Sequence, residues 1–299
     1  MRPWLIAPML AVAWGLNWPA VKILLATLPP FTMRVLGLGA AALLLAGVAR
    51  ARGLALVPPR AQWPALALAG TLNVAAFNVC TAFAQLNTST SRAAVLTYSM
   101  PMMSALLAVW LLGERLSRRA LLALASGSAG LALLAWPAVR AAGAPGSGVS
   151  MLGLTMPLAA ALAWALGTIA TKRWPLHGDR IVHTAWQLAI GAVCAALGVA
   201  LAHESWPAQW PAVTLVALAY HVVIAMALGY LLWFVLLQRQ GAAVAALTTL
   251  AVPVVGVLGA MALMGERPSA ADWSGFVLVL AGAALILLPQ RRGADLSER

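Results

Sequence analysis

Long apolar stretches separated by short polar connections run through the whole chain. A helix needs about 20 apolar residues to cross a hydrocarbon core of about 30 Å, and ten stretches have roughly that length. They cover residues 4–26, 31–49, 64–86, 92–112, 117–136, 150–172, 180–201, 210–237, 241–264 and 268–288. The pattern predicts an all-α membrane protein with ten transmembrane helices.

Much of the sequence pattern occurs twice. When the chain is shifted by 152 positions, residues 250–289 match 13 of the 40 residues of 98–137. The matches include two Gly-Glu-Arg triplets, which end at Arg115 and Arg267. The opening of the chain is also echoed in its second half, so an internal duplication spans nearly all of it.

The duplication divides the chain into two repeats of five predicted helices, residues 1–137 and 150–299. Residues 138–149 between them are rich in Gly, Pro and Ser, as is typical of a linker. Because five is odd, the second repeat starts from the opposite side of the membrane, and the two repeats are predicted to be inverted. Arg2 and the following apolar run resemble a secretion signal, but Trp14 recurs in the second repeat, so we expect this run to stay in the fold.

Composition supports a membrane location. With 63% hydrophobic and 9% charged residues, a soluble fold of this size could not cover its apolar surface. The net charge of +12 does not indicate nucleic acid, because the basic residues lie in the gaps between apolar runs. Cys80 and Cys194 lie inside apolar runs, so neither a disulfide framework nor a Cys-rich metal site is predicted.

The basic residues also predict the orientation. Placing both termini on one side puts 14 of the 19 Lys and Arg residues there. The other side receives Arg92, Arg140 and Arg267, while Lys22 and Arg34 fall within helices near that side. The positive-inside rule therefore predicts cytoplasmic termini.

The predicted spans have no Asp or Glu near their middle. Many ion-driven transporters and cation exporters use a buried carboxylate there. Glu114 and Glu266 lie at helix ends beside arginines, where a local ion pair or helix cap is the simplest interpretation.

Neutral polar and aromatic residues are instead predicted near mid-depth in both repeats. Polar groups in hydrocarbon need partners or water, so these side chains are predicted to face inward and to line a substrate cavity. The candidates are Trp14, Asn17, Trp18, Asn73, Phe77, Asn78, Tyr98, Met102, Trp164, Thr168, His221, Met226, Tyr230, Thr248 and Thr249. The alternative for each Asn or Thr is that it only holds helices together. His221 is either a hydrogen-bonded interior residue or a proton carrier.

Two prolines and two cations complete the unusual positions. Pro101 and Pro253 lie midway along their helices, where each is predicted to produce a kink; the carbonyls that they free could alternatively receive an ammonium group. Lys22 and Arg34 are predicted to extend to the membrane interface. Gln187 corresponds to Arg34, which also allows a hydrogen-bonding role at that position, and either cation could steer a carboxylate.

Together these features resemble a known family. The Trp-Gly-Leu-Asn sequence at 14–17, Pro30 and Phe31 ahead of Arg34, and the doubled Gly-Glu-Arg segments resemble the EamA branch of the drug/metabolite transporter superfamily. The asparagines of the first and third helices resemble the YddG-type exporters of aromatic amino acids. The resemblance implies a bacterial inner-membrane protein with a central cavity that opens alternately to each side.

The leading functional hypothesis is therefore export of aromatic and other neutral amino acids by facilitated or weakly coupled transport. A neutral amino acid is a zwitterion, so its binding site needs polar groups for the ammonium and the carboxylate and an aromatic lining for the apolar side chain. In the second repeat Gly167 and Thr168 replace Asn17 and Trp18, so the cavity should be asymmetric. The small multidrug exporters, whose four-helix unit resembles each half of this chain, rely on a buried glutamate in their first helix. The first predicted helix of this chain contains no glutamate.

Other functions remain as alternatives. The cargo could be a purine, a sugar, an organic anion or a lipophilic cation. An enzyme is not expected, because the sequence contains neither HExxH nor Gly-x-Ser-x-Gly, and inverted repeats favour a carrier over a channel. We expect no cofactor and no metal. The partners should be the lipid bilayer and a small-molecule substrate, and the duplicated fold can be complete as a monomer.

Overall fold

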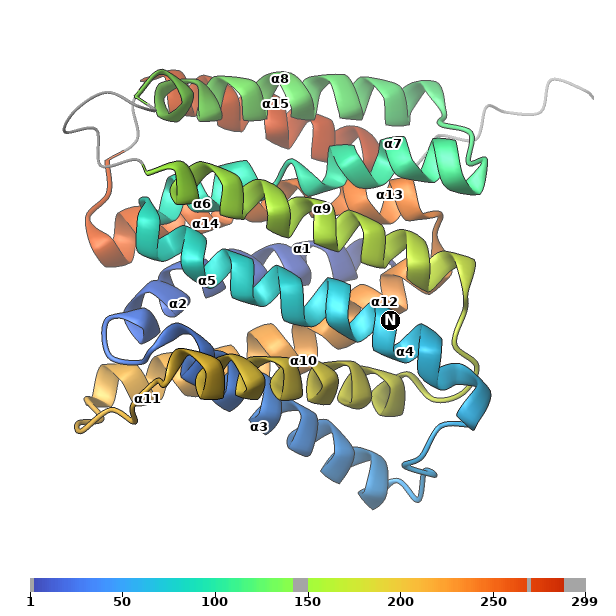
Figure 1. The fold of residues 1–299 in the computed structure, drawn as a ribbon. Coiled ribbons are helices and arrows are strands. Elements are labelled where there is room, and N and C mark those ends of the chain that lie inside the picture. The colour runs from blue at the N-terminus through green and yellow to red at the C-terminus, as the bar shows by residue number, and fades with distance from the viewer. Residues whose placement is uncertain (1–2, 142–149, 268–269, 288–299) are drawn as a thin grey trace, which may run out of the picture.

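The computed structural model describes residues 3–141, 150–267 and 270–287. All regular secondary structure in these ranges is helical, and the helices run roughly side by side in one bundle (Figure 1). The prediction of an all-α fold is confirmed for this part of the chain.

Eight segments of the described residues are long and apolar enough to cross a membrane. They agree with eight of the ten predicted spans. In chain order they are built from α1 (Pro3–Gly15) and α2 (Asn17–Leu25); α3 (Pro30–Ala51); η1 (Arg60–Gln62), α4 (Trp63–Ala69), η2 (Gly70–Ala76) and α5 (Phe77–Asn87); α6 (Thr90–Thr97) and α7 (Met100–Leu112); α9 (Met151–Arg173); α10 (Arg180–Ala202); α11 (Ala212–Tyr220), η3 (His221–Leu228) and α12 (Gly229–Arg239); and α13 (Ala242–Leu247), η4 (Thr248–Ala251) and α14 (Val252–Met264). The chain is a multi-pass membrane protein.

Two further helices, α8 (Arg118–Ala141) and α15 (Ala270–Leu287), pack along each other at one edge of the bundle (Figure 1). Small residues allow this close approach, because a Cβ added to Gly130 would lie 2.6 Å from the Gly275 carbonyl oxygen. Helix α8 continues through residues 138–141 of the predicted linker. Residues 142–149 of that linker lie outside the described residues.

Prolines interrupt three of the spans. The α6–α7 rod is broken at residues 98–99, ahead of Pro101, and a short 3-10 segment, η4, precedes Pro253. A third break, at Leu16 between α1 and α2, lies three residues before Pro19. Proline lacks an N–H group and its ring clashes with the carbonyl four residues earlier, which explains the breaks. The break at Leu16 was not predicted from the sequence.

Two spans contain π-helical segments at corresponding places. These are η2 in the third span and η3 in the span from Ala212 to Arg239. They carry Asn73 and His221, respectively, toward the middle of the bundle, where both side chains are fully buried. Single π turns within α-helices are frequent at functional sites.

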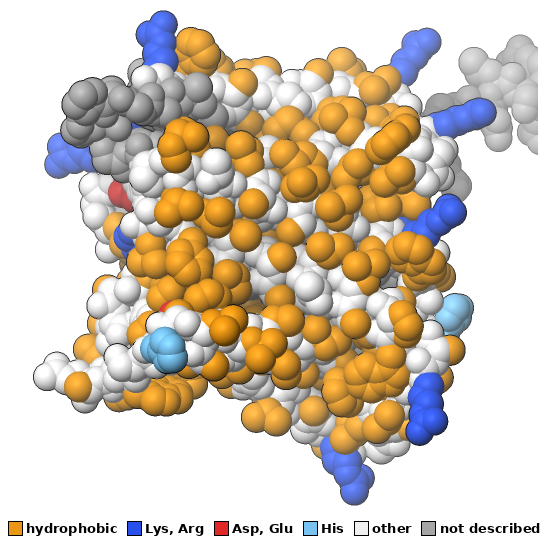
Figure 2. Space-filling view, viewed as in Figure 1, with side chains coloured by type: hydrophobic (Ala, Val, Ile, Leu, Met, Phe, Trp, Pro, Cys, Tyr) orange, Lys and Arg blue, Asp and Glu red, His pale blue; other side chains and the backbone are white. Residues whose placement is uncertain are grey.

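Charge and apolar surface are segregated along the bundle. On the face shown in Figure 2, hydrophobic side chains cover the middle and most Lys and Arg side chains lie at the two ends. The two Gly-Glu-Arg corners lie at opposite ends, one after α7 and the other after α14 (Figure 1). Each begins with a glycine in the left-handed conformation, with φ of 67° at Gly113 and 69° at Gly265. Glycine adopts this conformation without steric penalty, so both helices end cleanly there.

The corner glutamates bind helices of the opposite half of the chain. Glu114 accepts hydrogen bonds from the backbone N–H groups of Ala242 (2.8 Å) and Ala243 (3.2 Å) at the start of α13. Glu266 accepts a hydrogen bond from the Ser91 hydroxyl at the start of α6. Glu114 thus acts as a helix cap, one of the two expected roles, but the helix it caps belongs to the other half of the chain. Both carboxylates connect the two halves.

Lys22 also binds within the bundle. Its ammonium group donates to the carbonyl oxygen of Gln85 near the end of α5, and Lys172 donates in the same way to the carbonyl of Gln240 at the end of α12. Cations are favoured at helix C-termini, where carbonyl groups lack intrahelical partners. The half-buried Lys22 side chain therefore extends to the end of a neighbouring helix and binds there.

Candidate functional site

A small cavity lies in the interior of the bundle, between residues of both halves of the chain. Its volume is about 40 Å³, enough for about three or four water molecules if each needs roughly 10–15 Å³. Ligand pockets usually measure about 300–1,000 Å³. The structure therefore shows this cavity in a closed form.

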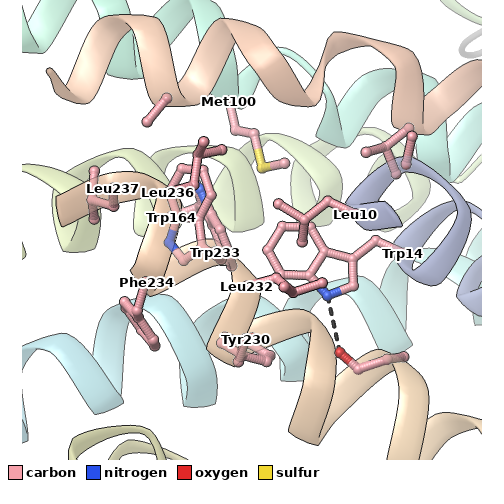
Figure 3. Packing of buried hydrophobic residues seen from close by; sticks show 14 of the residues in the cluster. Leu10, Trp14, Met100, Trp164, Tyr230, Leu232, Trp233, Phe234, Leu236 and Leu237 are labelled. Carbon is pink, nitrogen blue, oxygen red and sulfur yellow. Dashed lines mark hydrogen bonds between the residues drawn. The ribbon is translucent and has the colours of Figure 1, made fainter. Parts of the chain in front are cut away.

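Several aromatic rings line the cavity, and Figure 3 shows Trp14, Trp164 and Tyr230 among the packed side chains. The Trp14 ring meets Trp164 edge to face at a centroid distance of 5.3 Å and lies 5.8 Å from Tyr230, and Phe77 lies 4.7 Å from Trp164. The Trp14 indole N–H donates to the carbonyl of Ala225 in η3 at 3.0 Å, drawn as the dashed line in Figure 3. This bond and the ring contacts fix the position of Trp14.

A buried amide network holds these rings in place. Asn73 donates to the carbonyl of Trp164 at 2.9 Å, and the Tyr230 hydroxyl donates to the carbonyl of Asn73 at 2.9 Å. Asn78 donates to the Tyr230 hydroxyl at 2.7 Å and to the carbonyl of Val74 at 2.9 Å. Since α5, η2, α9 and α12 all contribute, the network ties the first half of the chain to the second.

Arg34 of α3 brings a positive charge to this cavity. Only 2% of its surface is exposed. Its Nε donates to the carbonyl of Asn78 at 2.8 Å, Nη2 donates to the Thr81 hydroxyl at 3.1 Å, and Nη1 lies 3.5 Å from Nε2 of His221. The predicted extension of Arg34 to the membrane interface was wrong, because α5 and η3 enclose its side chain.

His221 positions both Arg34 and Asn17. Its Nδ1 lies 2.7 Å from the side-chain oxygen of Asn17, which can only accept a hydrogen bond, so Nδ1 carries the proton. The lone pair on Nε2 then faces Arg34. A Cβ at Gly37 would lie 2.5 Å from the imidazole ring, so this glycine makes room for His221.

The cavity brings together nine of the fifteen predicted site residues. They are Trp14, Asn17, Trp18, Phe77, Asn78, Tyr98, Trp164, Met226 and Tyr230. Asn73 and His221 do not line the cavity in this structure, but each bonds directly to residues that do.

The other four predicted residues do not line the cavity. The hydroxyls of Thr248 and Thr249 bond to carbonyls three or four residues earlier in their own helix. Met102 accepts a contact from the Ser128 hydroxyl of α8. Thr168 is fully buried, and its hydroxyl has no partner among the described residues. The structure thus gives Thr248 and Thr249 a local role.

Five further lining residues were not among the predicted site residues: Val21, Arg34, Thr81, Gln85 and Met100. Thr81 and Gln85 continue the face of α5 that carries Asn78, at spacings of three and seven residues. Helical periodicity could have identified them. Arg34 is an unusual cation within a predicted span, but its position in the chain does not predict how deep in the bundle its side chain lies.

A much larger cleft of about 820 Å³ opens near the end of α9, between α10 and α12. Its mouth is basic, with Arg52, Lys172 and Arg180 in its lining. Deeper in, it reaches Gln187 and Phe234. The side-chain oxygen of Gln187, a residue only 1% exposed, has no hydrogen-bond partner among the described residues.

Aromatic rings separate the cleft from the central cavity. Phe234 lines the cleft, Tyr230 lines the cavity, and their ring centroids are 6.2 Å apart. Tyr230 in turn lies 6.0 Å from Trp164. The central cavity is lined by neutral, aromatic and basic side chains, whereas the cleft also has one acidic residue, Asp179, in its lining. The described residues contain no cluster of three His, Cys, Asp or Glu that could hold a metal ion.

Comparison with known proteins gives a consistent result. A family model described as the EamA-like transporter family matches residues 2–136 and 151–288. The chain is 26% identical to the uncharacterized transporter YvbV of Bacillus subtilis, over 95% of this chain and 91% of the relative. It is 27% identical to a probable amino-acid metabolite efflux pump of Escherichia coli, over 93% and 92% of the two chains.

The fold also resembles a solved crystal structure. The TM-score is 0.71 at 21% sequence identity, and the likeness covers 95% of each chain. At this identity the likeness concerns the fold alone.

Proposed function

Because the chain belongs to the EamA-like transporter family, we propose that it exports aromatic and other neutral amino acids across the bacterial inner membrane. Relatives in Escherichia coli and Salmonella typhimurium are named probable amino-acid metabolite efflux pumps. The aromatic cavity supports the narrower substrate class, because tryptophan and tyrosine rings pack well against aromatic and thioether side chains.

The observation that carries the proposal is the pair of unequal cavities. One side of the aromatic barrier has an open cleft of about 820 Å³, and the other side has a closed cavity of about 40 Å³. A carrier that works by alternating access needs such a barrier, with one path open while the other is closed. The structure then corresponds to a state that is open on the cleft side.

We extend the proposal to the topology: ten spans form two inverted repeats, and both termini are cytoplasmic. Paired contacts support the inverted repeats. At one end of the bundle Glu114 and Lys172 each bind the other half or a neighbouring helix, and Glu266 and Lys22 make the corresponding bonds at the opposite end. Lys172 and the other basic residues of the cleft mouth lie at the end where the positive-inside rule places the cytoplasm. The open cleft then faces inward.

The test is counterflow in proteoliposomes. Vesicles that contain the purified protein and unlabelled phenylalanine should accumulate labelled phenylalanine faster than empty vesicles do. Phe77→Ala removes a ring 4.7 Å from Trp164 and should lower this rate, whereas Leu43→Ala, at a side chain that is 75% exposed, should not. Absence of counterflow with phenylalanine, tryptophan, methionine and threonine would refute the proposed substrate class.

A second candidate cargo is another small organic anion. The cleft favours it, because the cations Arg52, Lys172 and Arg180 outnumber the one acidic lining residue, Asp179, and an excess of positive charge in a cleft concentrates anions there. Lipophilic cations are disfavoured, since Arg34 adds a positive charge to the central cavity.

Export without a coupling ion is the simplest mechanism, and proton coupling through His221 is the alternative. Counterflow measured with and without an imposed pH gradient distinguishes the two mechanisms.

A further inference from the structure

Arg34 is a buried cation whose described partners are all neutral. They are a backbone carbonyl, a hydroxyl and an imidazole that accepts through its unprotonated nitrogen. A guanidinium group stays protonated at physiological pH. Taking such a charge out of water carries a penalty of several kcal/mol unless an opposite charge or a full set of hydrogen bonds compensates it.

No carboxylate of the described side chains compensates this charge, because each one binds the start of a helix. Glu114 binds α13, Glu266 binds α6 and Asp179 binds α10. Glu204 binds the backbone and hydroxyl groups at the start of α3. The central cavity has no acidic residue in its described lining.

The guanidinium also has hydrogen-bonding capacity left. It carries five N–H groups, and its described contacts use one on each of the three nitrogens, the one to His221 at a long 3.5 Å. One N–H on Nη1 and one on Nη2 remain without a partner among the described residues. Two such groups, one on each terminal nitrogen, match the two oxygens of a carboxylate.

From this geometry we propose that Arg34 binds the carboxylate of the transported molecule and selects for cargo that has one. The identity of the cargo as an amino acid rests on the proposed function. A single guanidinium balances a single negative charge, so the site fits a monocarboxylate better than a doubly charged phosphate ester. The aromatic lining of the same cavity receives the apolar side chain, and its ring faces can also attract the ammonium group.

The closed cavity is too small for this ligand, so the site forms fully when the helices around it move apart. Arg34 lies on α3, and its bonds to Asn78 and Thr81 attach it to α5. The charge therefore moves with these helices and stays at the cavity wall. The selectivity should appear in binding as well as in transport.

The experiment compares ligands that differ only at the carboxylate. Binding of phenylalanine, phenylalaninamide and 3-phenylpropanoate to purified wild-type protein is measured by calorimetry in detergent. We expect phenylalanine to bind at least about tenfold more tightly than the amide, as a charge-assisted pair of hydrogen bonds would give. Equal affinity for the acid and the amide would overturn the proposal, even if phenylalanine is transported.

Variants assign the selectivity to Arg34. Arg34→Met should abolish the preference for the acid over the amide, and Arg34→Lys should retain part of it because the charge remains. Arg50→Met on the same helix, where the side chain is exposed, is the matched control and should leave the preference unchanged. If Arg34→Met does not fold, a reduced preference in Arg34→Lys still supports the proposal, and an undiminished preference in either variant contradicts it.

The ligand set also separates this inference from the proposed function. If 3-phenylpropanoate binds in an Arg34-dependent way and phenylalanine does not, the carboxylate site stands and the amino-acid assignment fails. If neither carboxylate binds, the inference itself is overturned.

Discussion

Replacing Tyr230 by Phe should destabilise the protein although the ring remains. The ring contacts with Trp14 and Trp164 would be retained. What is lost is the hydroxyl, which accepts from Asn78 at 2.7 Å and donates to the carbonyl of Asn73 at 2.9 Å. All three residues are at most 2% exposed.

The magnitude follows from these two bonds. Each buried hydrogen bond contributes about 0.5–1.5 kcal/mol net, and a buried group left without its partner raises the loss toward about 1–3 kcal/mol. Asn78 keeps its bond to Val74, so the carbonyl of Asn73 is the group that loses most. We expect the free energy of unfolding to fall by about 2 kcal/mol.

The assay is denaturant unfolding of the purified protein in detergent micelles. Tyr220→Phe is the matched control, because its hydroxyl bonds to carbonyls of α1 from a half-buried position outside the network. This control should lose less than half as much stability. If Tyr230→Phe is as stable as wild type, or loses no more than the control, the assignment of the network as a structural tie is wrong.

Three further predictions address packing, the tie between the halves and alternating access. Gly229→Ala places a methyl group 2.4 Å from the indole nitrogen of Trp14. It should weaken phenylalanine binding, measured by calorimetry, at least about tenfold and lower the free energy of unfolding, measured by denaturant titration, by about 1–3 kcal/mol. Gly47→Ala, where an added Cβ would have no neighbour within 4 Å, should change neither the binding nor the stability. Glu114→Ala removes the cap of α13 and should lower the free energy of unfolding by about 1–2 kcal/mol. Glu114→Gln, which keeps a side-chain oxygen but loses the charge, should lose less stability than Glu114→Ala. Equal losses of stability in the two variants would contradict this expectation. In a background without Cys80 and Cys194, Gln238→Cys in the open cleft should react with a soluble maleimide faster than Gln85→Cys in the closed cavity, and equal rates would contradict the closed state.

The sequence predicts well those features that depend on local chemistry. The length of the apolar runs predicts the spans, and proline geometry predicts the breaks ahead of Pro101 and Pro253. The sequence predicts poorly those features that depend on the hydrogen-bond register within a helix or on how deep a side chain lies in the bundle. The π-helical segments η2 and η3 change the direction of Asn78 and Tyr230, and no local pattern distinguishes a π turn from an α turn.

The same limit applies to polar side chains within the candidate site. Thr248 and Thr249 look like cavity residues in the sequence, but their hydroxyls bond to their own helix, an option open to any helical threonine. Arg34 lies one turn after the start of α3, a position from which most arginines reach the membrane surface. Only the packing of α5 and η3 around it shows that the side chain points inward.

An unpaired arginine at the cavity has a consequence for the transport cycle we propose. Closing the cavity without cargo buries a cation against neutral groups, whereas closing it around a carboxylate buries an ion pair. The two closures differ in free energy by the amount that the interaction between Arg34 and the cargo strengthens when water leaves the cavity, because a ligand shifts a conformational equilibrium only by its differential affinity for the two states. A permanent acidic partner would already compensate the charge of Arg34, and this contribution of the cargo to closure would be lost. Because the described partners of Arg34 are all neutral, we expect the loaded carrier to close more readily than the empty one.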